Sequence, residues 1–511
     1  MKKIAFVFLY IVSVLSLFAQ SKQGHQRVIG TYNPIIDFNV IPAQIDTAKL
    51  YGSSCSGMPN TPLTNPSSIC DSNGNMLLIS NGISVYDACM NLIDGGDTLP
   101  PYLYSIWSGG YSRGHQTSIF LPFPNNQYAF ITLGVSDSLY NTPLFNDTAF
   151  THWQDISYCH RIDMNANNGA GKVVKKRELM AKDVKLSATQ MMACRHSNGI
   201  DWWLLQADQD SVNVHTYLIR PDSVIYHGKQ HLPFDKRRKF DLAGQMTMSQ
   251  DGSRWATVSA NTEGHVFIAD FDRCYGILSQ PKKIQVPYMN YIDYHDTTIQ
   301  IDSQALGICF SPNNEYLYVS KWSHILQYEF STGHWFTVSP PDTVHQYAGY
   351  SYLDLGPDNR IYVGHWHSLF NYMSIIEQPD IGGAGCSFCR LCIGNNAPSG
   401  HMRFMANMPN YTLGPKTCWP LASSEVLMNK EEVQVYPNPS NDKITFESSL
   451  FTISDADIEI YDLLGHKVLQ QKLSKGKRMY SISLSSLQLG LYHYKIRVAS
   501  QVLTGKLMKR E

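Results

Sequence analysis

Two phrases in the second half of the chain decide the fold. Residues 311–319 read SPNNEYLYV and residues 356–363 read GPDNRIYV. In each phrase, a turn built on Asn and Asp runs directly into aromatic and β-branched side chains. Asn and Asp tolerate the positive φ values of tight turns, whereas aromatic and β-branched residues favour strands. Each phrase therefore predicts a tight turn that enters a β-strand.

The same kind of phrase occurs six times between about residues 25 and 425. Its second turn residue stands at positions 74, 126, 199, 252, 314 and 359, a mean spacing of 57 residues. A period near 50 residues is typical of a four-stranded unit, the blade of a β-propeller. We therefore expect an all-β fold with a six- or seven-bladed propeller, whose seventh blade would combine residues 32–40 with a last strand near residue 410. An array of β-sandwiches with incidental turns is the alternative.

The turn phrases resemble the "SPDG..LYV" blades of YVTN, WD40-like and lactonase-type propellers. A longer series of phrases, at residues 74–82, 196–203, 270–274 and 409–411, is similar to a group of secreted bacterial propeller proteins with no assigned activity. The resemblance implies the propeller fold. It does not imply an activity, because a fold of this kind supports many unrelated functions.

The composition excludes several classes of protein. Charged residues make up 16% of the chain, apolar residues 43%, and the formal net charge is −1. This balance excludes a disordered polyelectrolyte. It also lacks the excess of basic residues that is typical of nucleic-acid-binding proteins. After the N-terminus no run of 18 apolar residues occurs, so we expect no membrane span.

The N-terminus has the pattern of a secretory signal peptide over residues 1–20. Lys2 and Lys3 precede an apolar run that begins at Ile4, and Ala19 stands near its end. The run is too short to span a bilayer comfortably. We expect export through the inner membrane, with a retained anchor as the less favoured alternative.

Export makes disulfides permissible for the eleven cysteines. Cys386, Cys389 and Cys392 form a C-x-x-C-x-x-C run, which could begin a zinc or iron–sulfur site with Cys418 or His401 as a further ligand. The odd total leaves at least one thiol unpaired or paired between chains. We favour disulfides and buried thiols over metal, because the compartment is oxidising.

The residue composition of the chain changes near residue 425. We expect a propeller over residues 21–425, a polar linker over residues 426–432, and a small Ig-like β-sandwich over residues 433–511, in which apolar and polar residues alternate in about seven short strands.

The tail resembles the type IX secretion C-terminal sorting domain. The matching residues are Tyr436, Pro437, Asn438, Pro439, Asp462, Gly465, Gly490, Tyr492 and Lys506. The resemblance implies recognition by the outer-membrane translocon and a mature protein that is extracellular or held on the outer cell surface. An ordinary ligand-binding sandwich is the alternative.

Two histidines, His365 and His367, stand two residues apart after a predicted strand, so both imidazoles would lie on one face. Such a pair could bind a metal. Histidines among aromatic residues are more often packed or hydrogen-bonded, and we favour that interpretation.

A second candidate is the turn that contains His196, Asn198 and Asp201, which could line the central channel and contact a ligand. The alternative is a turn held by its own Asn and Asp side chains.

A third candidate is Asp270, Asp272 and Arg273, in which two carboxylates face the same way along a strand. They could hold calcium or a ligand, but a structural ion pair is favoured because the spacing of an EF-hand loop is absent.

Two hypotheses about function remain. The chain lacks G-x-S-x-G, H-E-x-x-H and P-loop motifs. We therefore favour a propeller that binds an extracellular protein or glycan through loops at one face, without a cofactor. The alternative is a lactonase-like hydrolase or lyase with a metal in the central channel, for which calcium is the candidate. Asp270, Asp272, His196 and His365 are the residues that would test it.

Overall fold

The structure is a computed structural model, and its described residues fall into many short segments. They are residues 21–29, 34–46, 67–101, 115–140, 153–209, 213–233, 244–258, 264–292, 299–302, 305–340, 349–365, 372–394, 405–418, 433–448, 450–462, 465–498 and 501–510. The chain divides into two compact units, Met1–Pro420 and Leu421–Glu511.

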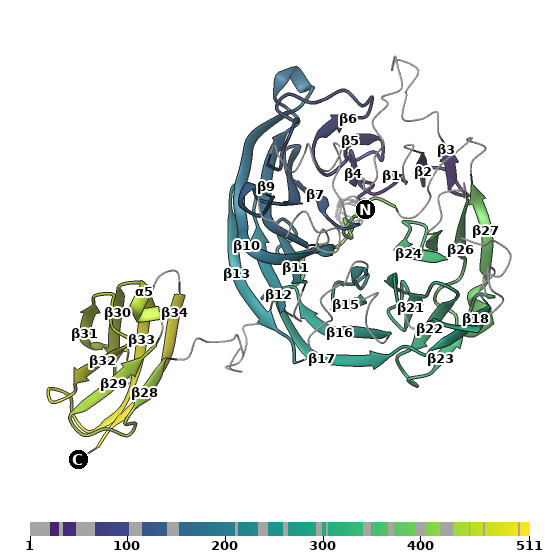
Figure 1. Ribbon diagram of the computed structural model, residues 1–511. Coiled ribbons are helices and arrows are strands. Elements are labelled where there is room, and N and C mark those ends of the chain that lie inside the picture. Colours follow the sequence, from purple (N-terminus) through teal and green to yellow (C-terminus); the bar gives the residue numbers. More distant parts are fainter. Residues whose placement is uncertain are drawn as a thin grey trace, which may run out of the picture. The chain divides into compact units, whose positions relative to one another are not determined.

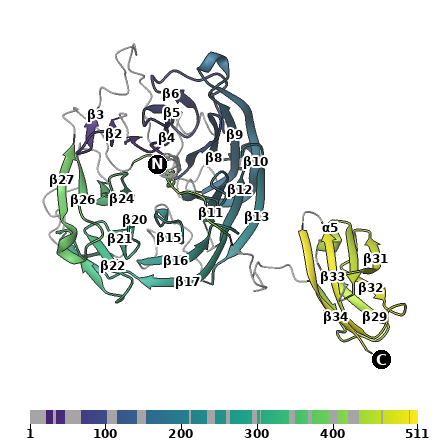
Figure 2. The same ribbon diagram turned by 180° about the vertical axis from the view of Figure 1, so that it is seen from behind.

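The first unit consists of antiparallel sheets arranged as a ring of blades (Figures 1 and 2). Two three-stranded sheets come first: β1 (Gln26–Val28), β2 (Ile35–Asp37) and β3 (Gln44–Asp46), then β4 (Ser67–Cys70), β5 (Met76–Ser80) and β6 (Val85–Asp87). A seven-stranded sheet follows: β7 (Ser118–Phe123), β8 (Gln127–Gly134), β9 (Trp153–Asp163), β10 (Lys172–Arg195), β11 (Trp202–Asp208), β12 (Asn213–Ile219) and β13 (Val224–His231).

Three four-stranded sheets complete the series. They are β14 (Met246–Met248), β15 (Arg254–Val258), β16 (His265–Asp272) and β17 (Ile277–Gln285); β20 (Ile308–Phe310), β21 (Tyr316–Ser320), β22 (Ile325–Glu329) and β23 (Trp335–Thr337); and β24 (Tyr350–Leu355), β25 (Ile361–His365), β26 (Tyr372–Ile376) and β27 (Phe388–Gly394). The hairpin β18 (Met289–Ile292) and β19 (Ile299–Asp302) is inserted between the first two sheets, and α3 (Asp137–Tyr140) and 3-10 turns at Asn167–Gly169 and Gly383–Cys386 are the described helical segments of this unit.

The seven-stranded sheet consists of two blades that share β10. The first part of β10 pairs with β9, and its last ten residues pair with β11. The burial of β10 changes at the same place: the first part is largely exposed, and residues 186–194 are all buried. One long strand is therefore the outer strand of one blade and the inner strand of the next.

The ring closes through strands from both ends of the unit. Met405 forms an antiparallel bridge with Ile29, directly after β1, and the Ala406 N–H donates to the carbonyl of Val28 at 3.0 Å. The late segment thus becomes the inner strand of the first blade, which contacts β4 on one side and β27 on the other. Counted in this way, the described residues form seven blades. The predicted propeller is confirmed, with a closing blade assembled as expected.

The recurring turns have the predicted backbone. The second turn residue has a positive φ in all six phrases: Gly74 (92°), Asn126 (55°), Gly199 (75°), Gly252 (70°), Asn314 (61°) and Asn359 (62°). In several turns the preceding Asn or Asp accepts hydrogen bonds from backbone N–H groups two or more residues on, as Asp251 does from Ser253 at 2.9 Å. This geometry explains why the sequence repeats Asn, Asp and Gly at these points.

The second unit is a small two-sheet β domain. One sheet contains β28 (Gln434–Tyr436), β29 (Lys443–Glu447) and β32 (Met479–Ser483); the other contains β31 (Lys467–Leu473), β30 (Ala456–Tyr461), β33 (Gly490–Val498) and β34 (Gln501–Lys509), with α5 (Leu450–Ile453) between β29 and β30. Buried residues from both sheets, including Phe446, Ile458 and Ile496, form its core. The predicted small C-terminal β domain is confirmed.

Candidate functional site

A pocket of about 110 Å³ lies at the end of the central channel where the inner strands run into their turns. Five blades contribute to it. Its lining comprises Ser21, Gly24, His25, Arg27, Met192, Ala193, Gln245, Thr247, Met248, Gln250, Cys309, Phe310, Leu353, Asp354, Leu355, Gly356, Pro357, Met408, Pro409, Asn410, Tyr411 and Thr412. Charged groups and three methionines thus share one concave surface, the combination expected of a ligand site.

Side-chain amides connect the inner strands across the channel. Gln245, which lines the pocket, accepts hydrogen bonds from the N–H groups of Ile308 (3.0 Å) and Leu353 (3.1 Å) and donates to the Leu353 carbonyl at 2.7 Å. Gln116 bonds to both the N–H and the carbonyl of Met246, and to Asn407 at 3.2 Å. These amides are used to hold the blades together, so they form a structural layer rather than a set of free ligand donors.

Arg27 provides the positive charge of the pocket. Its Nε donates to the Gly24 carbonyl at 3.1 Å, and its guanidinium lies 5.4 Å from the centroid of the Phe38 ring. The two terminal amino groups make no hydrogen bond or ion pair with any residue that the structure describes. Burial lowers the pKa of Arg27, although the nearby Asp354 carboxylate opposes this shift. A guanidinium that is anchored through Nε and has two unbonded terminal amino groups is suited to bind an oxyanion.

Asp354 provides the negative charge. It lies on the inner strand β24 and is partly accessible to solvent through the pocket. Oδ2 accepts a long hydrogen bond of 3.4 Å from the Met405 N–H, and Oδ1 has no partner among the described residues. Burial raises the pKa of Asp354 to about 6, against the opposing effect of Arg27. Arg27 and Asp354 interact electrostatically but are more than 4.0 Å apart, too far for a direct ion pair.

The remaining polar groups are neutral or already bonded. Burial, followed by the charge of Lys22, lowers the pKa of His25, and its buried Nδ1 has no hydrogen-bond partner in the described part of the chain. Burial raises the pKa of the Cys309 thiol, which keeps it protonated and unreactive. The Tyr411 hydroxyl donates to the Phe120 carbonyl at 3.1 Å. Arg27, Asp354 and His25 are therefore the ionisable side chains of the described lining that are open to a ligand.

The donor set does not fit calcium. Calcium takes six to eight oxygen ligands. Within the described residues the pocket offers one open carboxylate, Asp354, beside the positive charge of Arg27, while Oδ1 of Asn410 already accepts from Thr412. No group of three or more His, Cys, Asp or Glu side chains is placed to hold a metal in the part of the chain that the structure describes.

Of the site residues expected from the sequence, those that the structure describes do not line this pocket. His196, Asn198 and Asp201 do lie together, but they bond to one another. Asn198 Oδ1 accepts from the N–H of Asp201 at 2.9 Å, Asn198 Nδ2 donates to Asp201 Oδ2 at 2.9 Å, and the Asn198 N–H donates to His196 Nδ1 at 3.0 Å. The cluster is a turn between β10 and β11, and Asp201 also pairs with Arg220 at 3.7 Å.

The three residues of the D-F-D-R phrase separate. Asp270 is exposed and lines a groove between blades, whereas Asp272 accepts a 2.7 Å hydrogen bond from the Cys274 N–H and shapes a turn. Arg273 is buried and donates to two carbonyl oxygens, those of Arg195 (2.9 Å) and Gly414 (2.7 Å). It joins two blades to the late segment, without a described ion pair to either Asp.

His365 is buried at the end of β25, where its Nε2 lies 3.0 Å from the Ser374 hydroxyl and its ring 5.3 Å from that of Tyr350. His367 and His401 lie outside the described residues, so the proposed histidine pair stays a prediction.

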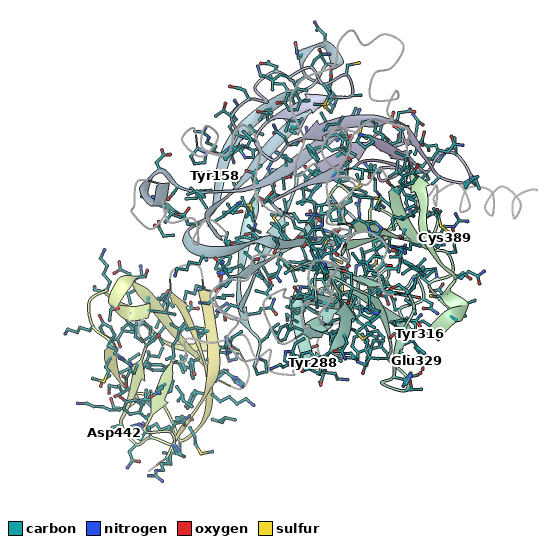
Figure 3. The ribbon with its side chains drawn as sticks, turned by 45° about the vertical axis from the view of Figure 1, so that its right-hand side comes forward. Tyr158, Tyr288, Tyr316, Glu329, Cys389 and Asp442 are labelled. Atoms are coloured by element: carbon teal, nitrogen blue, oxygen red, sulfur yellow. A yellow bond between two sulfur atoms is a disulfide. The ribbon has the colours of Figure 1, made fainter. Side chains whose placement is uncertain are left out.

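The ten cysteines that the structure describes take the favoured disulfide and buried-thiol forms. Disulfides join Cys274 to Cys418 and Cys389 to Cys392, and Cys89 is also disulfide-bonded. Cys389 lies at the rim of the propeller (Figure 3). Cys386 is a buried thiol, as are Cys70, Cys159, Cys194 and Cys309. In this form Cys389 and Cys392 offer no thiolate to a metal.

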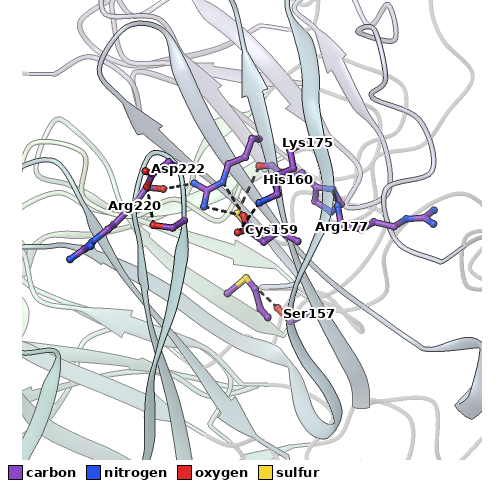
Figure 4. A network of polar contacts seen from close by, with 11 residues as sticks. Ser157, Cys159, His160, Lys175, Arg177, Arg220 and Asp222 are labelled. Carbon is purple, nitrogen blue, oxygen red and sulfur yellow. Dashed lines mark hydrogen bonds and ion pairs between the residues drawn. The ribbon is translucent and has the colours of Figure 1, made fainter. Parts of the chain in front are cut away.

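A second charged cluster, at β9 and β10, contrasts with the pocket (Figure 4). Arg161 donates through Nε and Nη2 to Glu178 Oε2 (3.3 and 3.2 Å) and through Nη1 to the Arg220 carbonyl, while Lys175 pairs with Glu178 Oε1 at 3.0 Å. The nitrogens of Arg161 and both oxygens of Glu178 are thus occupied by protein. This cluster is structural.

Sequence reasoning missed Asp354, although a signal was present. Aligned on the six turns, the residue four positions before the first turn residue is Ile69, Leu121, Cys194, Thr247, Cys309 and Asp354. These residues occupy equivalent positions on the six inner strands, and Asp354 is the one charged side chain among them. Arg27 had no comparable signal, because its blade is completed by a distant part of the chain.

The C-terminal unit can be assigned by comparison. Residues 434–510 match the family model of the secretion system C-terminal sorting domain. The tail is a type IX sorting domain. It implies export to the cell surface or the extracellular space and interaction with the secretion machinery. In the described residues we find no helix with the length and apolarity needed to cross a membrane.

The motif residues of the sorting domain hold its two ends together. Between Pro437 and Pro439, Asn438 donates to the Lys506 carbonyl and accepts from the Met508 N–H, both at 2.9 Å. The other motif residues serve local structure: Tyr436 donates to Glu447 (2.7 Å), Asp462 accepts from the N–H of His466 (2.9 Å) in a turn with Gly465 at φ 84°, Gly490 begins β33, and Tyr492 donates to the Gln488 carbonyl (2.8 Å).

Solved structures similar to the chain include other propellers. The periplasmic gluconolactonase PpgL from Pseudomonas aeruginosa has a TM-score of 0.36 at 9% identity, over 89% of this chain and 98% of that one. The Dos1 propeller has a TM-score of 0.33 at 12% identity, over 59% and 70%. The extracellular domain of BT4673 from B. thetaiotaomicron has a TM-score of 0.32 at 11% identity, over 96% of this chain and 56% of that one. Similarity of this degree does not bear on function. No curated protein sequence matches the chain.

Proposed function

We propose that this chain is an exported β-propeller that binds a small anionic ligand in the channel pocket, with the oxyanion on Arg27. Interaction with an extracellular protein or glycan, the broader expectation from the sequence, would then use other parts of the surface. The sorting domain supports the exported location, and the pocket supports the binding role.

The observation that carries the proposal is an open pair of opposite charges. Arg27 and Asp354 lie in one concave pocket, each anchored by a single hydrogen bond and neither paired with the other. Burying an ionisable group without a direct partner is unfavourable, and structural charges such as Arg161 are normally fully bonded. A ligand that supplies an oxyanion to Arg27, and a hydrogen-bond donor to Asp354, would satisfy both groups.

A thermal-shift screen of the full chain tests the proposal. The panel contains carboxylates, amino acids, short peptides, sugar acids and neutral sugars, and each compound is tested against wild type, Arg27→Met and Lys182→Met. Met keeps the apolar stem beside Phe38, and Lys182 is an exposed control on another strand. At a ligand concentration of about 100 times Kd, binding adds about 2.7 kcal/mol to the stability.

An anionic compound should stabilise wild type and Lys182→Met but not Arg27→Met. If no compound in the panel stabilises wild type, or if Arg27→Met responds as wild type does, the proposal is wrong.

A second function, hydrolase or lyase, is favoured by one specific observation. A carboxyl group with a pKa near 6, in a pocket that is also lined by a neutral imidazole, can act as a general base near neutral pH. Asp354 would accept the proton, and Arg27 would hold the developing oxyanion. Turnover of a compound found in the screen, lost in Asp354→Asn while Arg27-dependent binding persists, would establish this function over simple binding.

A further inference from the structure

The charges of the channel pocket balance, and this balance narrows the class of ligand. Arg27 and Asp354 are the charged side chains among the described lining residues, because His25 is neutral at pH 7. A ligand with a negative charge alone would leave Asp354 without a cation, and a ligand with a positive charge alone would leave Arg27 without an anion. A zwitterion supplies one group of each sign and pairs both side chains.

The spacing of the two charges suits a short zwitterion. The nitrogens of Arg27 and the oxygens of Asp354 are more than 4.0 Å apart, yet each side chain shifts the pKa of the other. In an α-amino acid the carboxylate and the ammonium group are attached to the same carbon atom, so a small molecule can contact both side chains at once. With its pKa raised to about 6 by burial, Asp354 is ionised at pH 7.5 and attracts a cation.

An apolar surface lies next to the guanidinium. A Cβ added at Gly24 would lie 3.7 Å from Nη2 of Arg27 and 3.7 Å from Sδ of Met408, so these two groups border the same space. Met192 and Met248 also line the pocket. Methionine side chains are flexible and polarisable, and they pack against apolar groups of varied shape. A carboxylate bound to Arg27 thus brings the rest of the ligand against thioethers.

The size of the pocket excludes a polymer. Its volume of about 110 Å³ is smaller than that of a cavity of about 150 Å³, which holds a benzene molecule. The ligand is therefore one small molecule with a small side chain. A charged side chain would add a third charge, for which the described lining offers no further partner.

The geometry points to a free α-amino acid with a small aliphatic side chain as the ligand of the channel pocket. This inference rests on the proposed binding function. To the carboxylate on Arg27 it adds an ammonium group on Asp354 and an aliphatic side chain against Met192, Met248 and Met408.

Isothermal titration of the full chain at pH 7.5 tests the inference with L-leucine and two matched analogues. 4-Methylpentanoate lacks the ammonium group, and 3-methylbutylamine lacks the carboxylate. L-Glutamate tests the side chain. Each compound is titrated into wild type, Asp354→Asn, Arg27→Met and the exposed control Lys182→Met. Asn at position 354 removes the charge and can still accept the hydrogen bond from the Met405 N–H.

Leucine should bind wild type and Lys182→Met at least about tenfold more tightly than either analogue or glutamate does. Asp354→Asn should bind leucine and 4-methylpentanoate with similar affinity, because the partner of the ammonium group is gone. Arg27→Met should lose the preference for leucine over 3-methylbutylamine, because the partner of the carboxylate is gone.

The inference and the proposed function fail in different ways. If 4-methylpentanoate or another anionic compound binds in an Arg27-dependent manner at least as tightly as leucine, the amino-acid class is wrong and anion binding stands. The inference also fails if Asp354→Asn keeps the full preference for leucine, or if glutamate binds as tightly as leucine. If Arg27→Met binds leucine as wild type does, or if neither these compounds nor any anionic compound binds wild type, both are wrong.

Discussion

Replacement of Asp354 by Asn is expected to stabilise the protein at neutral pH. Folding raises the pKa of Asp354 from 3.8 to about 6, mainly because the protein surrounds it. The folded state therefore holds the proton more tightly than the unfolded state, and the charged carboxylate destabilises the folded state above pH 6. A shift of about two units corresponds to about 3 kcal/mol when both states are ionised.

The sign of the pH dependence follows. For a raised pKa, the favourable contribution is complete below pH 3.8 and is lost as the pH rises through 6. The stability advantage of Asp354→Asn should therefore be near zero at pH 3.5, about 1.6 kcal/mol at pH 5 and about 3 kcal/mol at pH 8. Water in the pocket reduces these values, so they are upper limits.

Calorimetry of wild type and Asp354→Asn between pH 5 and pH 8 measures the difference. For a unit of this size, about 3 kcal/mol raises Tm by about 4 °C. Asn can still accept the hydrogen bond from Met405, so the change isolates the charge. A variant that is less stable at pH 8, or whose advantage does not change with pH, would refute the reasoning. A stabilising substitution that also weakens ligand binding would indicate that Asp354 is retained for function at a cost in stability.

Other predictions concern structure and export. Burial lowers the pKa of His160 to about 3, so the protein should lose stability as the pH falls below 6.5, by about 3 kcal/mol at pH 4. In unfolding measured as a function of pH, His160→Gln should reduce this loss. The control variant His334→Gln, at an exposed histidine, should not reduce it. Arg273→Met removes two buried hydrogen bonds to carbonyls and should lower the unfolding free energy by about 2–4 kcal/mol; a loss under 1 kcal/mol would contradict its bridging role. Cys274→Ser removes a disulfide between residues 144 positions apart and should lower the free energy of unfolding by up to about 5 kcal/mol. The denaturation midpoint measures this change, and an unchanged midpoint would show that the crosslink does not stabilise the fold. Deletion from Val433 should leave the protein in the periplasm, and normal amounts in the medium would disprove the sorting role.

The fold could be predicted because its signal is local and repeated. The turns at Gly74, Asn314 and Asn359 need positive φ values, and residues that tolerate these values recur in the sequence at each of the six turns. The closing blade could also be predicted, because a propeller ring closes by joining strands from the two ends of the domain. The sorting domain was predictable for a similar reason: its short motifs lie in order along one compact domain.

The pocket could not be predicted in the same way, because it depends on where separate blades meet. Arg27 and Asp354 are far apart in sequence and come together only when Met405 closes the ring. Conversely, the turn of His196 and Asn198 attracted attention because its polar residues are adjacent, yet their side chains form hydrogen bonds within the turn itself. Adjacent polar residues are the pattern of a turn, whereas a single charge on an apolar inner strand was the better guide.

The central claim is that the channel pocket is a binding site organised by Arg27. Isothermal titration of the full chain with the anionic compound that stabilises it most tests this claim most directly. The account predicts one ligand per chain for wild type and Lys182→Met, and at least about tenfold weaker binding for Arg27→Met. Equal affinity of wild type and Arg27→Met would contradict it.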